Sequence, residues 1–234
     1  MINAIFENQT IIEAYEILKS QLLLSIWETL YVTLFATFFA VVIGLPLGVI
    51  LVIGEKNGIR PLNSKLLSVI NFIINILRSI PFLILMILVF PLTRLIMGTV
   101  VGTSPTIVPL VIAAFPLVAR LAESSLREIN ANTIEMAQSL GASTYQIITK
   151  VMIRESIPSL ISNLTIATTT ILSYTAMSGI IGGGGLGKIA INYGYYRYKT
   201  LVMIVAVIFL VLLVQAIQTL GTKVAVKLDK RNKK

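Results

Sequence analysis

The uncharged stretch TLYVTLFATFFAVVIGLPLGVILVIG, residues Thr29 to Gly54, decides the class of fold. A transmembrane α-helix needs about 20 consecutive apolar residues, and this run is longer. The whole chain of 234 residues is 56% hydrophobic and only 12% charged. A soluble domain carries about 25% charged residues. The sequence therefore predicts an all-α integral membrane protein.

Four further apolar stretches follow, separated by loops that contain Gly, Pro or charged residues. They predict a polytopic bundle of five transmembrane helices over residues 26–222. The expected spans lie at about 28–53, 68–94, 106–123, 157–181 and 200–221. Apolar residues at helical spacing in 1–25 predict a short amphipathic helix that leads into the first span. Residues 223–234 form a basic tail.

Lys and Arg residues are divided unevenly between the two sides that five spans define. Twelve lie on the side of the tail and of the connection at about 130–155, and five lie on the other side. Cytoplasmic loops carry an excess of Lys and Arg. We therefore expect the tail and this connection in the cytoplasm, and the N-terminus with residues 1–25 outside.

The absence of certain residue types excludes several classes of function. The chain has no Cys and no His, which removes thiolate nucleophiles, Cys-ligated metals and the usual proton shuttle. From Thr29 onward only Glu123 is an acidic residue within an expected span, so no catalytic pair can be assembled there. The net charge of +9 is typical of cytoplasmic Lys and Arg rather than of nucleic-acid binding. We expect no enzyme activity, catalytic residue, metal or cofactor.

The polar stretch EMAQSLGASTYQIITKV, Glu135 to Val151, interrupts the apolar chain. Gly141 suits the left-handed position that ends a helix. Ser143 with Gln146 three residues on is the signature of a capping box that opens a second helix. The stretch thus predicts two short helices joined by a tight turn. Such a unit is either a connector on the membrane surface or a stiff docking element for a soluble partner.

The stretch EMAQSLGASTYQIITKVMI resembles the EAA loop of bacterial ABC importer permeases. Glu135, Met136 and Ala137 correspond to Glu-Ala-Ala, and Gly141 to the glycine of that loop. Met136 replaces the middle Ala, and Arg154 stands where Pro is usual. The stretches RSIPFLILMILVFPLTRLIMGT, SYTAMSGIIGGGGLGKIAINYGY and GLPLGVIL also resemble the permease subunit of the methionine ABC importer family. The match covers about 28–223.

This resemblance implies the fold of an ABC type I importer permease in the bacterial inner membrane. It implies a homodimer that binds two copies of a separate ATP-hydrolysing subunit and receives substrate from an extracytoplasmic solute-binding lipoprotein. The substrate would be methionine, as D- and L-enantiomers, with another amino acid or a methionine-containing dipeptide as alternatives. The residues carried over to the ATPase contact are Glu135, Ala137, Gly141, Ala142 and Ser143. An autonomous channel or ion-coupled carrier is the alternative of another class, although no mid-membrane acidic residue is visible for ion coupling.

The stretch GGGGLGKI, Gly182 to Ile189, matches part of a nucleotide-binding P-loop. Ile189 stands where the Ser or Thr that binds magnesium is required, and no strand precedes the glycines. We therefore interpret this stretch as a turn where the backbone passes close to neighbouring helices. A role in gating, or in receiving the binding protein, is a further hypothesis.

Other polar residues within the apolar stretches are structural or pathway candidates. Arg78 either extends to the membrane interface or pairs with backbone carbonyls freed by Pro81, a structural role in both cases, and contact with the substrate is the alternative. Arg120 and Glu123 predict an interfacial ion pair. Polar residues of the fourth span either pack between helices or line a translocation route. The candidates for pathway or gate are Tyr174, Met177 and Ser178.

Overall fold

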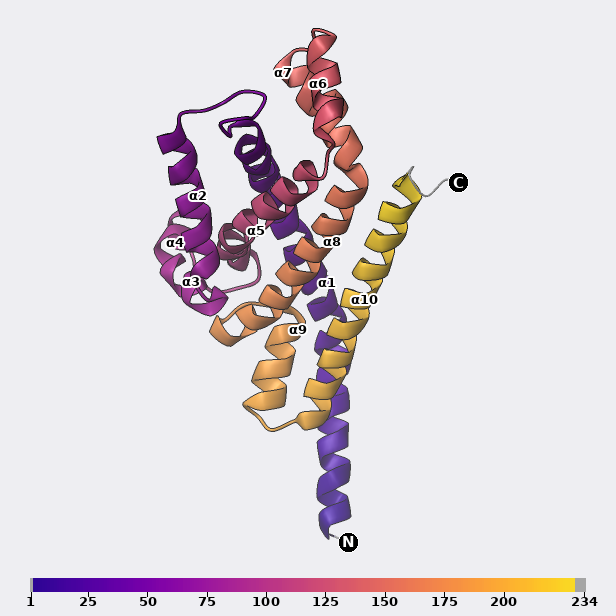
Figure 1. Cartoon of the computed structure of the whole chain (residues 1–234). Coiled ribbons are helices and arrows are strands. Elements are labelled where there is room, and N and C mark those ends of the chain that lie inside the picture. Colours follow the sequence, from indigo (N-terminus) through magenta and orange to yellow (C-terminus); the bar gives the residue numbers. More distant parts are fainter. Residues whose placement is uncertain (1, 230–234) are drawn as a thin grey trace. The chain divides into compact units, whose positions relative to one another are not determined.

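The computed structural model describes residues Ile2 to Asp229, with side chains from Ile11 onward, and every regular element in this part is helical (Figure 1). The α-helices are α1 (Ile2–Ile53), α2 (Ser64–Ser79), α3 (Phe82–Leu88), α4 (Phe90–Met97), α5 (Ile107–Arg127), α6 (Ala131–Ser139), α7 (Thr144–Gln146), α8 (Ile153–Ser178), α9 (Gly185–Lys188) and α10 (Thr200–Leu228). Two 3₁₀ segments, η1 (Ser104–Thr106) and η3 (Gly179–Ile181), and two π segments, η2 (Ile147–Met152) and η4 (Ile189–Tyr195), join them. The all-α prediction is confirmed. Lys230–Lys234 of the predicted tail and Met1 lie outside the described residues.

Four helical stretches are long and apolar enough to cross a membrane. They are Ile11–Ile53, Ser104–Arg127, Thr144–Ile181 and Thr200–Leu228, and α2 with α3 would make a fifth, broken span. The helix predicted at 68–94 is not continuous, because α2 ends at Ser79 and Ile80 is extended with ψ 126°. Pro81 explains the break, since proline has no N–H to donate and disfavours a helical residue before it.

The chain forms two compact units. The first unit comprises Met1–Ala36, Phe82–Leu110 and Thr169–Ala216, and the second comprises Thr37–Pro81, Val111–Thr168 and Ile217–Lys234. The helix α1 runs through the expected boundary near residue 25 without a break, so the N-terminal segment and the first span are one helix.

In the second unit, α1 packs closely against α5. A Cβ atom on Gly48 would lie 2.7 Å from the carbonyl oxygen of Ala119 and 2.7 Å from Cβ of Ala122. Gly44 makes an equally close approach to α5 four residues earlier. Small residues at this spacing let helix backbones approach each other in membrane proteins. Helix α5 is therefore held at a fixed position against α1, and its Ala119 is buried in one cluster with Leu51 of α1 and Ile74 of α2.

In the first unit, the N-terminal part of α1 packs against η4 and α10. Ala14, Ile189, Val202 and Ala206 form its buried core. Lys199 Nζ lies 2.5 Å from Glu13 Oε2, at the edge of this core. The N-terminal segment is thus part of the folded unit and not an isolated helix.

Candidate functional site

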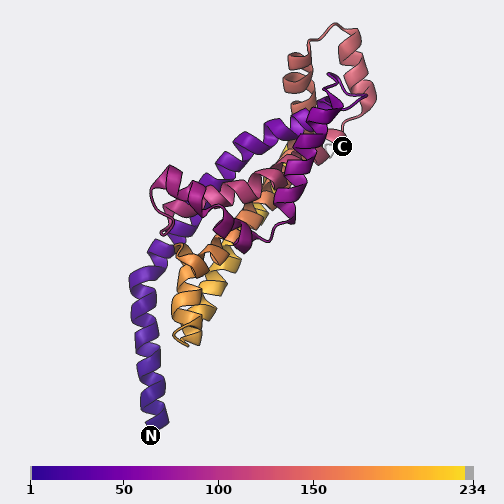
Figure 2. The ribbon, with the colours of Figure 1, turned by 90° about the vertical axis from the view of Figure 1, so that its left-hand side faces the viewer.

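The connection between α5 and α8 forms a helical hairpin in the second unit. Both views place it at the end of this unit where α1 ends and α2 begins (Figures 1 and 2). Helix α6 makes the first arm. The second arm, α7, continues through η2 into α8 without a break, so the expected second short helix is the start of a long one. Arg154, which stands at the family's usual proline position, is part of this continuous helix.

The turn between the arms is closed by backbone hydrogen bonds. Gly141 N–H donates to Gln138 O at 2.9 Å, and Ala142 N–H donates to Ala137 O at 3.1 Å. This is the Schellman pattern, which needs a left-handed residue at its centre. Gly141 has φ +76°, as predicted, and a Cβ atom there would meet nothing within 4 Å. Glycine is therefore required by the backbone conformation alone.

The predicted capping box opens the second arm. Ser143 Oγ accepts from Gln146 N–H at 3.3 Å, and Gln146 Oε1 accepts from Ser143 N–H at 2.9 Å. The turn is therefore fixed from both sides, because the end of α6 and the start of α7 each have bonded backbone groups. Two well-capped helix ends make a stiff hairpin.

Replacing Ser143 by alanine is expected to fray the second arm. Loss of a serine N-cap costs about 0.5–2 kcal/mol, so amide exchange at Gln146 should become roughly 2- to 30-fold faster. Hydrogen–deuterium exchange of the purified protein measures this. Ser139→Ala is the matched control, because the Ser139 hydroxyl only donates to Glu135 O within α6. Equal exchange rates in the two variants would contradict the capping role.

The hairpin has a buried face and an exposed face. Ala137 and Ala142 pack on a core that contains Ile147 and Met152. The opposite face exposes three large apolar side chains, namely Met136 (61%), Leu140 (81%) and Tyr145 (75%). Glu135 and Gln138 of α6 are also exposed and line a cavity of about 430 Å³. Apolar side chains gathered on an exposed surface mark interaction sites.

Polar contacts tie the two stems of the hairpin together. Ser125 of α5 is fully buried. Its hydroxyl accepts from Asn163 Nδ2 at 2.8 Å, and its carbonyl accepts from Ser156 Oγ at 3.1 Å. Ser159 Oγ lies 3.2 Å from Ser125 Oγ. In this unit, hydrogen bonds therefore join α5 to the start of α8 next to the hairpin.

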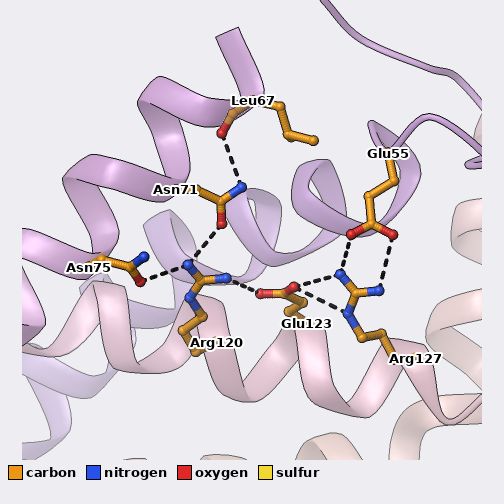
Figure 3. A network of polar contacts seen from close by, with 7 residues as sticks. All are labelled: Glu55, Leu67, Asn71, Asn75, Arg120, Glu123 and Arg127. Atoms are coloured by element: carbon orange, nitrogen blue, oxygen red, sulfur yellow. Dashed lines mark hydrogen bonds and ion pairs between the residues drawn. The ribbon is translucent and has the colours of Figure 1, made fainter. Parts of the chain in front are cut away.

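A charged network lies at the base of the hairpin (Figure 3). Arg127 binds Glu55 of the α1–α2 connection at 2.5 Å and Glu123 of its own helix at 2.8 Å. Arg120 binds Glu123 at 2.7 Å, which confirms the predicted ion pair, and also donates to Asn71 and Asn75 of α2 at 2.8 Å each. The network links α2, α5 and the α1–α2 connection.

Protonation of Glu55 should weaken this network. Hydrogen bonds from Arg127 hold the pKa of the Glu55 carboxyl below its ordinary value. A carboxyl with a lowered folded-state pKa stabilises the protein above its unfolded pKa, and this stability is lost as the pH falls through the folded pKa. The partners are about half exposed, so the contribution is about 0.2–1 kcal/mol.

Thermal unfolding of wild type and Glu55→Gln in detergent tests this pH dependence. The wild type should unfold at a higher temperature at pH 7, and the difference should shrink as the pH falls below the ordinary glutamate pKa and through the lowered pKa of Glu55. A difference that stays constant over this range would contradict the role of Glu55.

The structure does not bring the three pathway candidates together. The Tyr174 ring stacks on Phe82, with centroids 4.5 Å apart. Ser178 is fully buried and donates to Thr175 O at 2.7 Å. Only Met177, 43% exposed, lines a cavity of about 520 Å³ in the first unit, where Ser173 and Gln215 are the polar lining residues.

Arg78 does not make the predicted contact with carbonyls near Pro81. Its side chain is exposed, and it forms no hydrogen bond or ion pair with any residue of the described part, Ile11 to Asp229. Pro81 leaves no helix carbonyl without its usual partner, because α2 ends before Pro81 and the proline interrupts no helix. Of the two structural roles expected for Arg78, extension to the membrane interface is therefore the one that agrees with its exposed side chain.

The residues of the charged network were only partly accessible from sequence. Glu123 and Arg127 stand four apart on a helix, a spacing that predicts a pair. Glu55, Asn71 and Asn75 carry no such signal, because they are more than 40 residues away from their partners.

A multi-pass helical membrane protein with this hairpin has the fold of an ABC type I importer permease. The chain belongs to the family of inner membrane components of binding-protein-dependent transport systems, whose model matches residues 44–223.

Several of the similar proteins are named as methionine permeases. The chain is 44% identical over 222 residues to a probable D-methionine transport system permease protein, MetI, of Vibrio cholerae, covering 95% of this chain and 98% of the relative. It is 43% identical over 169 residues to the methionine import system permease protein MetP of Bacillus subtilis, covering 72% and 76%. A structure of the MetNI methionine ABC transporter in an inward-facing conformation matches with a TM-score of 0.89 and 40% identity, over 91% of this chain and 98% of that one. The chain is therefore a transport permease of the inner membrane.

Proposed function

We propose that this permease forms the translocation pathway for D- and L-methionine in an ATP-driven importer. It is moved by a separate ATPase subunit that binds the α6–α7 hairpin. The names of the relatives support the substrate. The geometry of the hairpin supports the coupling, because an ATPase can drive a transmembrane pathway only through a contact that does not deform.

The observation that carries the proposal is a stiff hairpin that exposes Met136, Leu140 and Tyr145. Its turn is closed at Gly141 and Ser143, and its inner face is packed on a buried core. Its second arm is continuous with α8, and the contacts of Ser125 join α8 to α5. A force on the exposed face is therefore passed to two spans together.

The proposed assembly has two copies of this permease and two copies of the ATPase. A solute-binding lipoprotein delivers the substrate on the outer side of the cell membrane. The hairpin and the tail face the cytoplasm, and the N-terminus faces out. The uneven distribution of Lys and Arg supports this orientation. Glu135, Ala137, Gly141, Ala142 and Ser143 are the residues proposed at or beneath the ATPase contact.

Within the first unit, the pathway candidates have different support. The exposure of Met177 and its place at a cavity support a role in the pathway. The ring stacking of Tyr174 and the buried hydrogen bond of Ser178 favour helix packing for these two residues.

Reconstitution of the permease with its ATPase and binding protein in liposomes tests the function. We expect uptake of labelled L- and D-methionine that needs ATP and both partners. Preferred uptake of another amino acid or of a methionyl dipeptide would contradict the substrate. Uptake by the permease alone would indicate a channel or ion-coupled carrier and would overturn the proposal.

A further inference from the structure

Three segments of the first unit meet at two adjacent residues of α1. Glu28 Oε1 accepts from Thr103 Oγ1 at 2.8 Å, and Glu28 Oε2 accepts from Gly185 N–H at 2.7 Å. Thr29 Oγ1 accepts from Leu186 N–H at 2.9 Å. The glycine-rich stretch of the sequence is thus held by α1 and by the loop that precedes η1. Gly102 N–H, which donates to Gly182 O at 2.9 Å, joins that loop to the stretch directly.

Glu28 is an unusual residue at this place. It lies within the apolar helix Ile11–Ile53, and no Lys or Arg of the described part forms an ion pair with it. A partly buried carboxylate without a cationic partner is costly unless strong hydrogen bonds satisfy it. The backbone amide of Gly185 and the hydroxyl of Thr103 supply such charge-assisted bonds. Both carboxylate oxygens are therefore engaged in holding other segments.

The fit between these segments explains why the stretch is rich in glycine. A Cβ atom on Gly184 would overlap Thr103 Oγ1 and lie 2.7 Å from Glu28 Oε2. A Cβ atom on Gly185 would lie 2.5 Å from Thr29 Oγ1, and its backbone is left-handed with φ +79°. The bonds to Glu28 and Thr29 form only because the backbone can approach α1 this closely.

We propose that Glu28, Thr29 and Thr103 form a clasp on Gly182–Leu186 that opens and recloses in each transport cycle, with Glu28 as the positioning residue. This inference rests on the proposed function, because it requires a transport cycle. Opening exchanges the carboxylate bonds of Glu28 for bonds to water or to other donors, and it involves no covalent step.

Two features indicate that the clasp can open and reclose. Glu28 and Thr103 are only partly buried, so water can replace their bonds. The clasped stretch is also flanked by a 3₁₀ segment, η3, and leads through the short α9 into a π segment, η4. Irregular helical segments of this kind mark hinges and functional sites. A permanent tie would more simply be built from apolar packing between regular helices.

A reversible disulfide tests whether the clasp opens. The chain contains no native Cys, so the double variant Val101→Cys/Gly182→Cys has one possible intramolecular bond, and it leaves Glu28, Thr29 and Thr103 in place. A Cβ atom on Gly182 would lie 3.8 Å from Val101 Cβ, within the range of about 3.5–4.5 Å that a disulfide needs. In the reconstituted complex, oxidation should lower methionine uptake at least about tenfold, and reduction should restore it. Uptake that is equal in the oxidised and reduced states would overturn the clasp.

Substitution of Glu28 separates a moving clasp from a static tie. Glu28→Gln keeps an acceptor for Gly185 and a donor for the Thr103 hydroxyl, whereas Glu28→Ala keeps neither. We expect Glu28→Ala to raise methionine-independent ATP hydrolysis per assembled complex at least about threefold, and Glu28→Gln to stay within about twofold of wild type. Lower thermal stability of Glu28→Ala with unchanged ATP hydrolysis would show a static tie and contradict the proposal.

The clasp and the proposed function fail in different ways. If the chain is not an ATP-driven methionine permease, the wild type and the reduced double-cysteine protein will both lack ATP-dependent uptake. If only the clasp is wrong, both will transport methionine, and so will the oxidised protein.

Discussion

Replacement of Gly141 by valine is expected to weaken binding of the ATPase subunit by about tenfold. A left-handed backbone costs an L-residue about 1–2 kcal/mol, with a β-branched side chain at the upper end, and 1.4 kcal/mol corresponds to a factor of ten. The strain reduces the fraction of hairpins with a closed turn, and apparent affinity falls with that fraction. Titration of the purified permease with the ATPase measures the change.

Gly98→Val is the matched control for Gly141→Val. Gly98 has φ +75°, and a Cβ atom on it also meets nothing within 4 Å, so the two substitutions impose the same local strain. Gly98 caps α4 in the first unit and is not part of the hairpin. Its variant should bind the ATPase as the wild type does. Unchanged binding by Gly141→Val, or an equal loss in both variants, would show that the turn is not specific to docking.

Replacement of Gly48 by leucine is expected to have the largest effect on the fold. The first atom of the new side chain would lie 2.7 Å from a backbone carbonyl of α5, which cannot rotate away. Overpacking of a core typically costs about 1–3 kcal/mol, and a backbone contact belongs at the upper end or above. The variant should unfold at a markedly lower temperature and accumulate poorly in the membrane.

Val42→Leu provides the comparison for Gly48→Leu on the same helix. Val42 is 53% exposed, so a larger side chain there has free space. Thermal unfolding in detergent should distinguish the two variants clearly. If Gly48→Leu were as stable as Val42→Leu, the close packing of α1 on α5 would be wrong.

Local chemistry made much of the hairpin predictable from sequence. The left-handed turn at Gly141 and the capping box of Ser143 depend on residues within six positions, so their residue types specify them. The length of the second arm was not predictable in this way. Its continuation into α8 passes through η2, where neither a glycine nor a proline marks the irregular hydrogen bonding.

Contacts between distant parts of the chain were not accessible from the sequence. The bonds of Glu28 to Thr103 and Gly185 join residues 75 and 157 positions apart. The apolar run that begins at Thr29 predicts a span, but it does not predict which residues Glu28 will bind. Pro81 was identified as a structural residue, but a continuous span was expected across it. In the structure, α2 ends before this proline, at Ser79. Membrane spans are predictable because they follow from local composition. Contacts between residues that are distant in sequence do not follow from it.

A single cysteine at Tyr145 tests the central claim most directly. Tyr145 is 75% exposed on the outer face of the hairpin, and the chain has no other cysteine to react. A membrane-impermeant maleimide should label Tyr145→Cys in inside-out vesicles but not in right-side-out vesicles, and bound ATPase should protect the site. Labelling from the outer side, or equal labelling with and without the ATPase, would contradict a cytoplasmic hairpin that docks the ATPase.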